Sequence, residues 1–358
     1  MASNACSLYL LEDVTEGMQL GTAIVKEDGK ILLAEGTLLT TKIIERLRNW
    51  GVTKVGIRED DVKPDFSAFN NPFTEEERLF RGEYTRAVGT MKLTFDAVRK
   101  FKKIPGREMN RMVDQTLVPL VSTVGAVNYL HQDKPIDDYT FFHSVNTAII
   151  AGVVAQWLGY QAEEIREIVA AGLLHDVGKT QIPLEILNKP GKLNHEEMKV
   201  MQLHATYSYK LISESGDFSS NVALAALQHH ERLDGTGYPA KVLSRKIHPY
   251  AKLVALADIY DAMTSDRVYR EKVTPFEVVE TLIQDMFGKL DPDMCSVFLK
   301  NLKDHFIGYV VQLNDGREAE VVFLGQSKAT RPVVRTRDGN VIGLDKTHDL
   351  GIVKVLRT

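Results

Sequence analysis

The stretch that decides how this chain folds is Gln228-His229-His230-Glu231-Arg232-Leu233-Asp234-Gly235-Thr236-Gly237-Tyr238-Pro239. It follows an apolar run at residues 222–227 that is typical of a buried helix. Adjacent imidazoles and carboxylates at the end of such a helix are costly to bury unless they are paired or bind a metal. We therefore expect further metal ligands on other apolar helices of the same domain.

The sequence on both sides of this stretch predicts an all-α core. Apolar residues recur at helical spacing from residue 74 to about residue 303, and segments with Gly or Pro, such as 189–191 and 234–239, separate the helices. At 358 residues the chain exceeds a typical single domain, so two or three domains are expected.

Further candidate ligands lie on these predicted helices. His143 shares a helix face with Asn146 and Ile150, and Asp258 lies in an apolar helix where a lone carboxylate would be costly. Neighbouring helical residues point about 100° apart, so an adjacent His-Asp pair suits two metals, with one residue reaching or bridging to the second. The candidates are His143, His175, Asp176, His204, His229, His230 and Asp258.

Each candidate also has an interpretation without metal. A single histidine on a helix face is usually a satisfied core or surface residue, and His175-Asp176 could cap a helix end. Seven such groups on apolar helices of one domain together favour a metal site. Imidazole and carboxylate without thiolate favour Fe, Mn, Zn, Ni or Co over copper(I) or structural zinc.

The ends of the chain differ from its helical middle. Asp28-Gly29 predicts a hairpin, and Thr40 an N-cap, in a small α/β unit. From Gly308 onward, strands separated by Asp-Gly turns predict a small sheet or barrel. We predict a multidomain, mainly α chain with a small α/β unit at 1–62, a helical linker region at 63–124, the metal-binding helical domain at 125–304 and a small β module at 305–358.

Composition excludes little but points to the cytoplasm. A formal net charge of −4 gives no support to a protein that binds a nucleic-acid polymer by bulk electrostatics. The two cysteines, Cys6 and Cys295, form no CxxC pattern, which suits a reducing compartment. No signal peptide and no apolar stretch long enough to span a bilayer are visible, so we expect a cytoplasmic protein without a membrane partner.

Two motifs resemble a known family. His175-Asp176-Val177-Gly178-Lys179 matches the HDxGK element of the HD-superfamily phosphohydrolases, and residues 229–239 match HHExxDGxGYP, the signature of the HD-GYP cyclic di-GMP phosphodiesterases. The similarity covers residues 125–303, including a helix around Asp258 that looks like the family's next helix. It implies an α-helical fold around a di- or trinuclear centre, often of iron or manganese.

The resemblance also implies which residues bind metal. His143, His175, Asp176 and Asp258 would bind one ion, and Asp176 would bridge to a second ion held by His204, His229 and His230. Some members bind a third ion through a glutamate four residues before the first histidine. That position is Tyr139 here. We therefore expect two divalent ions, with Fe or Mn favoured and Zn, Ni or Co as alternatives.

The chemistry expected of such a site is phosphodiester hydrolysis. A bridging water between two cations is deprotonated near neutral pH and attacks phosphorus. We expect Asp176 and Lys179 to be catalytic, and Lys179, Tyr238, Arg267 and Arg270 to contact substrate. The alternatives are a helix-end cation for Lys179, surface charges for the two arginines and a packed loop aromatic for Tyr238. Asp234 and Asp261 either cap local structure or hydrogen-bond a ligand histidine.

We predict a cyclic di-GMP phosphodiesterase that produces pGpG, with onward cleavage to GMP left open. One alternative is a hydrolase of another cyclic dinucleotide or nucleotide. The other is a non-catalytic cyclic di-GMP sensor or a module that docks a cyclase. The family's loop is linked to diguanylate cyclase (GGDEF) domains, which are candidate partners together with a second copy of the chain. The N- and C-terminal parts would be regulatory or packing elements.

Overall fold

The computed structural model describes residues 6–11, 14, 18–25, 31–34, 36–37, 39–50, 52–58, 75–123, 125–130, 139–265, 273–324, 331–347 and 349–357. The chain divides into two compact units. The first consists of Met1–Asn70 with Arg337–Val341, and the second of Asn71–Thr336 with Ile342–Thr358. The domain boundaries predicted from the sequence stay predictions.

In its described residues, the first unit contains short strands and the helix α1. Strand β1 (Cys6–Leu10) pairs antiparallel with β4 (Lys54–Arg58), and β2 (Ile24–Val25) pairs with β3 (Ile31–Leu33). Helix α1 (Thr41–Asn49) begins after Thr40, whose hydroxyl accepts a hydrogen bond from the Ile43 amide at 3.3 Å. The predicted hairpin and N-cap are therefore confirmed.

The second unit is mainly helical, as predicted. Its first helix, α3 (Glu75–Phe101), has three glutamates in its first turn, where the helix dipole favours negative charge. It is followed by α4 (Gly106–Met112), the π-helical turn η1 (Val113–Leu117), α5 (Val118–Val121) and the 3-10 turn η2 (Asn128–Leu130). The helical run is broken at Pro105-Gly106, where Pro105 is the N-cap of α4.

The remaining described helices of the second unit follow in chain order. They are α6 (Tyr139–Trp157), α7 (Ala162–Leu174), η4 (Val177–Gln181), α8 (Leu184–Leu187), α9 (His195–Ser215), α10 (Ser220–Gln228), η5 (Ser244–Lys246), α11 (Pro249–Thr264), α12 (Pro275–Asp285) and α13 (Pro292–His305).

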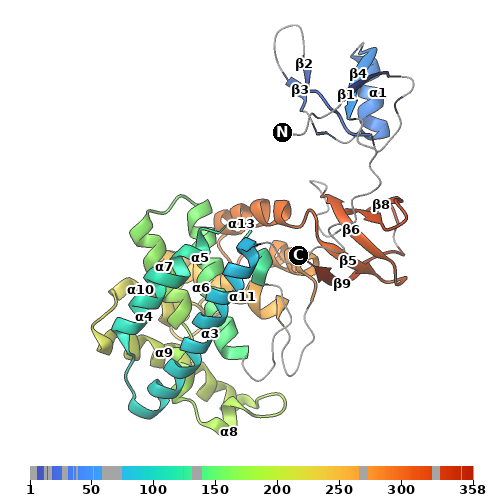
Figure 1. Cartoon of the computed structure of the whole chain (residues 1–358). Coiled ribbons are helices and arrows are strands. Elements are labelled where there is room, and N and C mark those ends of the chain that lie inside the picture. Colours follow the sequence, from blue (N-terminus) through green and yellow to red (C-terminus); the bar gives the residue numbers. More distant parts are fainter. Residues whose placement is uncertain are drawn as a thin grey trace. The chain divides into compact units, whose positions relative to one another are not determined.

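Helix α6 lies at the centre of this arrangement. It packs against α7, α11 and α3, and its residues from His143 to Ala155 are all buried (Figure 1). A helix that is buried on all sides has no polar face to orient it. Polar side chains on α6 are therefore enclosed and need partners from neighbouring helices.

Close packing near the predicted ligands depends on two glycines. A Cβ atom on Gly172 of α7 would lie 2.8 Å from the Cα atom of Ala148 on α6. A Cβ on Gly178 in η4 would clash with the carbonyl oxygen of His204 on α9. The absence of a side chain at these positions lets the helices that carry the ligands approach one another.

The C-terminal part is a five-stranded antiparallel sheet in the order β8-β7-β6-β5-β9. Its strands are β5 (Val310–Leu313), β6 (Glu318–Phe323), β7 (Val333–Thr336), β8 (Val341–Gly343) and β9 (Ile352–Arg357). One side of the sheet, including Val311 and Val334, joins the core of the helices. Arg335 pairs with Glu320 across β7 and β6 at 2.7 Å.

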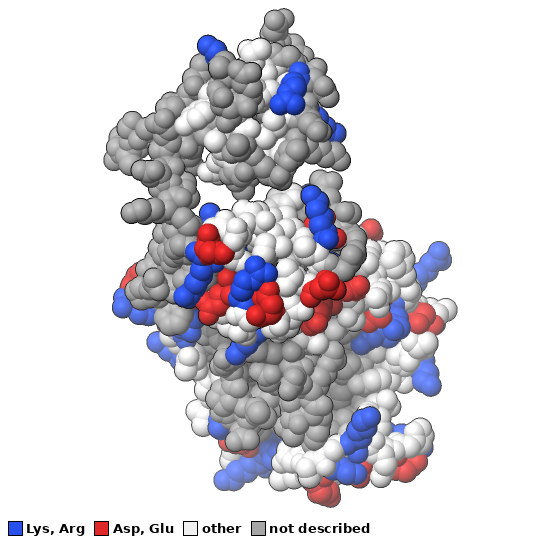
Figure 2. All heavy atoms as spheres, turned by 90° about the vertical axis from the view of Figure 1, so that its right-hand side faces the viewer, with Lys and Arg blue, Asp and Glu red and all other residues white. Residues whose placement is uncertain are grey.

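Charges of both signs are interspersed on the described part of the face shown in Figure 2. That face therefore presents no continuous basic surface of the kind that binds a phosphate polymer, within the described residues. Within the same residues, no helix combines the length and the apolar character needed to cross a membrane.

Candidate metal centre

The seven predicted ligands converge from five helices. His143 comes from α6, Asp258 from α11 and His204 from α9. The two His-containing pairs lie where α7 and α10 end, at His175-Asp176 and His229-His230. All of these residues are buried except His230, which is partly exposed.

Six of these side chains form two sets of ligand atoms, each within 4.8 Å of one another. We call His143, His175 and Asp258 the acidic ligand group, and His204, His229 and His230 the imidazole ligand group.

Asp176 lies between the two groups. Its Oδ2 atom is 3.3 Å from Nε2 of His175 and 3.7 Å from Nε2 of His143. Its Oδ1 atom is 3.3 Å from Nε2 of His204. The two oxygens of one carboxylate therefore face different ligand groups, which is the geometry that a bridging ligand needs.

Three of the imidazoles are oriented by the backbone of their own helices. The Nδ1 atoms of His175, His204 and His229 lie 2.7, 2.8 and 2.7 Å from the carbonyl oxygens of Gly172, Met201 and Ala226, each three residues earlier. A carbonyl oxygen can only accept a hydrogen bond, so each Nδ1 must carry the proton. The unprotonated Nε2 atoms then face the centre, as metal ligation requires.

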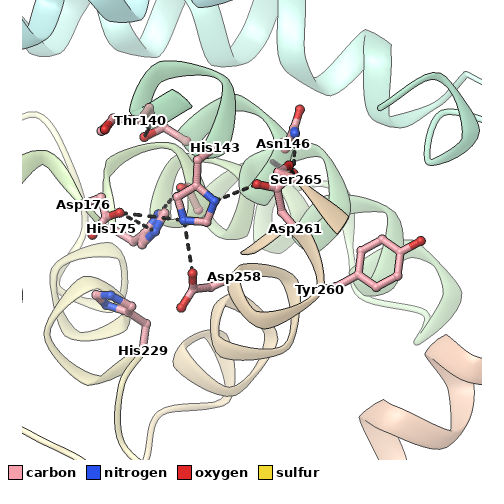
Figure 3. Close-up of polar contacts among 12 residues, drawn as sticks. Thr140, His143, Asn146, His175, Asp176, His229, Asp258, Tyr260, Asp261 and Ser265 are labelled. Atoms are coloured by element: carbon pink, nitrogen blue, oxygen red, sulfur yellow. Dashed lines mark hydrogen bonds and ion pairs between the residues drawn. The ribbon is translucent and has the colours of Figure 1, made fainter. Parts of the chain in front are cut away.

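His143 is oriented by a carboxylate. Its Nδ1 is 2.7 Å from Oδ2 of Asp261, which is one turn beyond Asp258 on α11 (Figure 3). Its Nε2 is 3.1 Å from Oδ1 of Asp258. Of the two interpretations of Asp261, hydrogen bonding to a ligand histidine is the one that matches this contact.

A cation fits between the two groups. Nε2 of His175 and Oδ1 of Asp176 are fully buried, and neither has a hydrogen-bond partner among the described residues. An unsatisfied buried polar atom costs about 1–3 kcal/mol, so such atoms call for a ligand. Nitrogen and oxygen donors without thiolate suit a divalent ion such as Fe, Mn or Zn.

The pKa values of the two ligand carboxylates are both lowered. Burial alone would raise the pKa of Asp176, but Lys179 and the imidazoles of His175 and His204 hold it well below its usual range. Burial also opposes ionisation of Asp258, yet His143 keeps the pKa of that carboxyl well below normal. Both carboxylates are therefore charged at neutral pH.

Four of the ligand histidines differ in the direction in which the protein shifts their pKa. Burial lowers the pKa of His204, and it lowers the pKa values of His229 and His230 much further, with neighbouring imidazoles adding to the effect. Burial would also lower the pKa of His143, but hydrogen bonds to Asp258 and Asp261 outweigh it and the pKa is raised. The imidazole ligand group is thus neutral and ready to bind a cation.

Lys179 lies beside the bridging carboxylate. Its Nζ atom is 2.5 Å from Oδ2 of Asp176, and its side chain is partly exposed. Two side chains hold the turn that carries it. The Gly178 amide donates to the Ser208 hydroxyl at 2.8 Å, and Arg99 of α3 donates to the carbonyl oxygens of Lys179 and Ile182 at 3.2 and 3.3 Å.

The Gly-rich loop packs on the imidazole ligand group. The ring of Tyr238 stacks on His230, with centroids 4.6 Å apart and an interplanar angle of 30°. Asp234 accepts hydrogen bonds from the amide and hydroxyl of Thr236, and so caps the loop. A side chain at Gly237 would collide with the carbonyl of His230, so this approach requires glycine.

The two predicted arginines, Arg267 and Arg270, lie outside the described residues. Arg99 and Glu231 support the centre but were not among the site residues predicted from the sequence. Glu231 is buried and accepts hydrogen bonds from the amides of Ala240 and Val242 at 2.7 and 3.1 Å, which holds the far side of the loop. Its place directly after two ligand histidines was a usable signal, whereas the position of Arg99 in a long helix carried none.

Known proteins share this region. Residues 132–294 match the family model of the HD domain. The chain is 32% identical over 233 residues to the cyclic di-GMP phosphodiesterase PA4108 of Pseudomonas aeruginosa, covering 65% of this chain and 56% of that protein. It is 36% identical over 170 residues to the 3'3'-cGAMP-specific phosphodiesterase 1 of Vibrio cholerae, covering 47% and 39% of the two chains.

A solved structure shares the fold. Bd1817, an HDG"Y"P protein from Bdellovibrio bacteriovorus, aligns with a TM-score of 0.51 at 19% identity, covering 84% of this chain and all of that one. At that identity the likeness concerns the fold alone. The chain spans only about half of the length of the curated relatives described above, at 56% and 39%.

Proposed function

We propose that this chain, whose residues 132–294 match the family model of the HD domain, is a metal-dependent phosphodiesterase that hydrolyses cyclic di-GMP to linear pGpG. The observation that carries the proposal is the position of Asp176, whose two oxygens face the acidic and the imidazole ligand groups separately. The names of several relatives, including the protein from Pseudomonas aeruginosa, support cyclic di-GMP as the substrate.

The proposed ligands follow the two groups. His143, His175 and Asp258 would hold one divalent ion, and His204, His229 and His230 the other, with Asp176 shared. When bound, the ions supply a water of lowered pKa as nucleophile and neutralise charge on the phosphodiester. We favour iron or manganese, and the donor set also suits zinc, nickel or cobalt.

The chain's own residues orient the substrate. Lys179, partly exposed beside Asp176, can turn its ammonium group towards a phosphate oxygen. Tyr238 is partly exposed over His230, so its ring can contact a guanine base at the edge of the centre. Burial raises the pKa of Tyr238, so its hydroxyl remains a neutral hydrogen-bond donor.

Turnover of cyclic di-GMP by the metal-loaded protein tests the proposal. Metal-free protein is loaded with Mn(II), or with Fe(II) under anaerobic conditions, and products are separated by chromatography. We expect pGpG to accumulate first, and later GMP would show that the same protein continues. Asp176→Ala should abolish turnover, whereas Asp114→Ala, which removes an exposed ion pair with Arg166, should not. Protein that binds two ions but gives no turnover with any of a panel of divalent metals would overturn the proposal that the chain is an enzyme.

A second candidate substrate is 3'3'-cGAMP, because relatives from Vibrio cholerae are named as specific for it. Comparison of kcat/KM for cyclic di-GMP and 3'3'-cGAMP under the same metal load separates the two. A guanine-specific pocket should favour the first substrate. A higher value for 3'3'-cGAMP would replace cyclic di-GMP in the proposal but keep the chemistry.

Two partner predictions accompany this function. A GGDEF-domain protein could dock on the loop around Tyr238, and the chain could form a homodimer. Sedimentation of the protein alone, and then with a purified GGDEF domain, measures both. If the chain binds cyclic di-GMP with both metal positions filled but never cleaves it, it is a sensor instead.

A further inference from the structure

Hydrogen bonds connect a helix outside the matched HD domain to one metal ligand. The hydroxyl of Tyr84, on α3, donates to Oδ1 of Asn146 on α6 at 2.5 Å. The amide nitrogen of Asn146 donates to Oδ1 of Asp261, and Oδ2 of Asp261 is 2.7 Å from Nδ1 of His143 (Figure 3). The family match begins at residue 132, well after Tyr84.

Each bond in this series fixes the direction of the next. Because the Tyr84 hydroxyl donates to the amide oxygen of Asn146, the amide nitrogen must face Asp261. Asp261 also accepts from the Ser265 hydroxyl at 3.2 Å, so its Oδ1 is held and its Oδ2 faces His143. A carboxylate can only accept here, so Nδ1 of His143 carries the proton and Nε2 is left free to bind a cation.

Tyr84 is placed firmly enough to have this effect. It is 9% exposed, and its ring lies between those of Phe80 and Phe142, each with a centroid 6.0 Å away. Burial and the nearby charge of Asp261 raise the pKa of Tyr84 well above its usual range, so the hydroxyl keeps its proton and remains a donor.

His143 differs in this respect from three other ligands. His175, His204 and His229 are oriented by carbonyl groups of their own helices, and these contacts form whenever the helix forms. His143 is oriented by side chains from α11 and α6, and through them by α3. Its orientation therefore depends on how three helices pack.

We propose that Tyr84 is a positioning residue for the acidic ligand group, and that through Asn146 and Asp261 helix α3 tunes the affinity of the cation bound by His143. The inference rests on the proposed metal binding but not on the substrate. It gives the segment before the HD domain a physical route, through Tyr84, to the acidic ligand group.

Metal titration of the Tyr84→Phe variant tests this. The substitution keeps the ring and removes only the hydroxyl. Calorimetric titration of metal-free protein with Mn(II) should show that one of the two equivalents binds with an affinity lowered by about 3- to 10-fold. Loss of a direct partner of a ligand costs about 10–100-fold, and Tyr84 lies two hydrogen bonds further away. Asp261→Asn should weaken the same equivalent by about 10–100-fold.

Two control variants show which ligand group holds the weakened equivalent. Tyr209→Phe removes the same atom from an exposed tyrosine on α9 and should leave both affinities unchanged. His230→Ala removes a ligand of the imidazole group, so the equivalent that survives in it identifies the acidic group.

A spectroscopic readout separates positioning from a general loss of stability. In Zn(II)-loaded protein with 15N-labelled histidine, the Nδ1–H resonance of His143 should shift or broaden in Tyr84→Phe, while those of His175, His204 and His229 stay in place. Unchanged affinities, or an equal loss at both positions, would overturn the inference. Two-ion binding without turnover would overturn only the proposed function, because the titration needs no substrate.

Discussion

The two ligand groups share Asp176 but differ in charge and in support. In the acidic group, His143 is held between the carboxylates of Asp258 and Asp261, at 3.1 and 2.7 Å. In the imidazole group, the rings of His229 and His230 lie 4.0 Å apart, and Nε2 of His204 is 3.4 Å from that of His229. One position offers negative charge to a cation, and the other offers mainly neutral nitrogen.

This difference indicates that the two proposed cation positions are not equivalent. Carboxylate ligands compensate the charge of hard ions such as Mn(II), whereas imidazole suits Fe, Zn, Ni and Co. The imidazoles also suppress one another's protonation, so their group is neutral without a metal. The centre therefore combines a position that attracts a cation by charge with one that is already deprotonated to receive it.

The largest expected effect comes from emptying one position. His230→Ala should remove one metal equivalent, keep the other, and lower kcat by about 10²- to 10³-fold, which is what a single preorganised electrostatic group is worth. Metal content and steady-state turnover measure both. His195→Ala, at an exposed histidine of α9, is the control and should retain two equivalents and full activity. Loss of both ions in His230→Ala would contradict the expectation that the two positions bind their ions independently.

The next effect concerns pH. The pKa of His143 is raised, so as pH falls through that pKa its imidazole gains a proton that a cation must displace. Affinity of the acidic position should then fall by up to about tenfold per pH unit. The pKa values of His229 and His230 lie well below normal, so the imidazole position should be nearly insensitive to pH over the same range. Calorimetric titration at several pH values counts the protons released. Equal pH dependence of metal affinity at both positions would show that the two ligand groups do not differ in protonation.

Much of this centre could be predicted from the sequence, because the ligands lie in helices with regular periodicity and in two specific motifs. The helix around Asp258 and the pairs His175-Asp176 and His229-His230 each lie in an apolar context that makes ligation the economical explanation. Helix geometry indicated that the pair His175-Asp176 could serve two ions. The assignment of the other residues to two groups came only from resemblance, because sequence spacing does not determine which helices face each other.

The supporting residues could not be predicted, and the reason is distance along the chain. Tyr84 is 62 residues from Asn146, and Arg99 is 80 residues from Lys179. A tyrosine and an arginine in a long amphipathic helix have many equivalent interpretations until packing selects one. For Asp261 the sequence left two roles open, a local cap or a hydrogen bond to a ligand histidine, because it lies one helical turn after Asp258.

A smaller effect should arise outside both groups. Arg99→Ala removes two hydrogen bonds to the turn that carries Lys179, so the ammonium group is held less firmly near the substrate. We expect KM for cyclic di-GMP to rise by about 3- to 10-fold, in line with about 1 kcal/mol per hydrogen bond. Both metal affinities should stay unchanged. Arg86→Ala, an exposed residue of the same helix paired with Glu83, is the matched control. A change in metal affinity would show that α3 acts on the centre by a second route through Arg99.

The smallest effect is expected at the loop over the imidazole group. Glu231→Gln leaves one of two backbone amides, those of Ala240 and Val242, without a carboxylate acceptor. Loss of this partly buried hydrogen bond to a charged acceptor should lower the free energy of unfolding by about 1–3 kcal/mol, measured by denaturant titration. Because Tyr238 lies on this loop, KM should rise by about twofold while both metal affinities hold. If the affinity of the imidazole position fell instead, the loop would be part of what keeps His230 in place, and the contrast between a self-supporting imidazole group and an externally supported acidic group would be wrong.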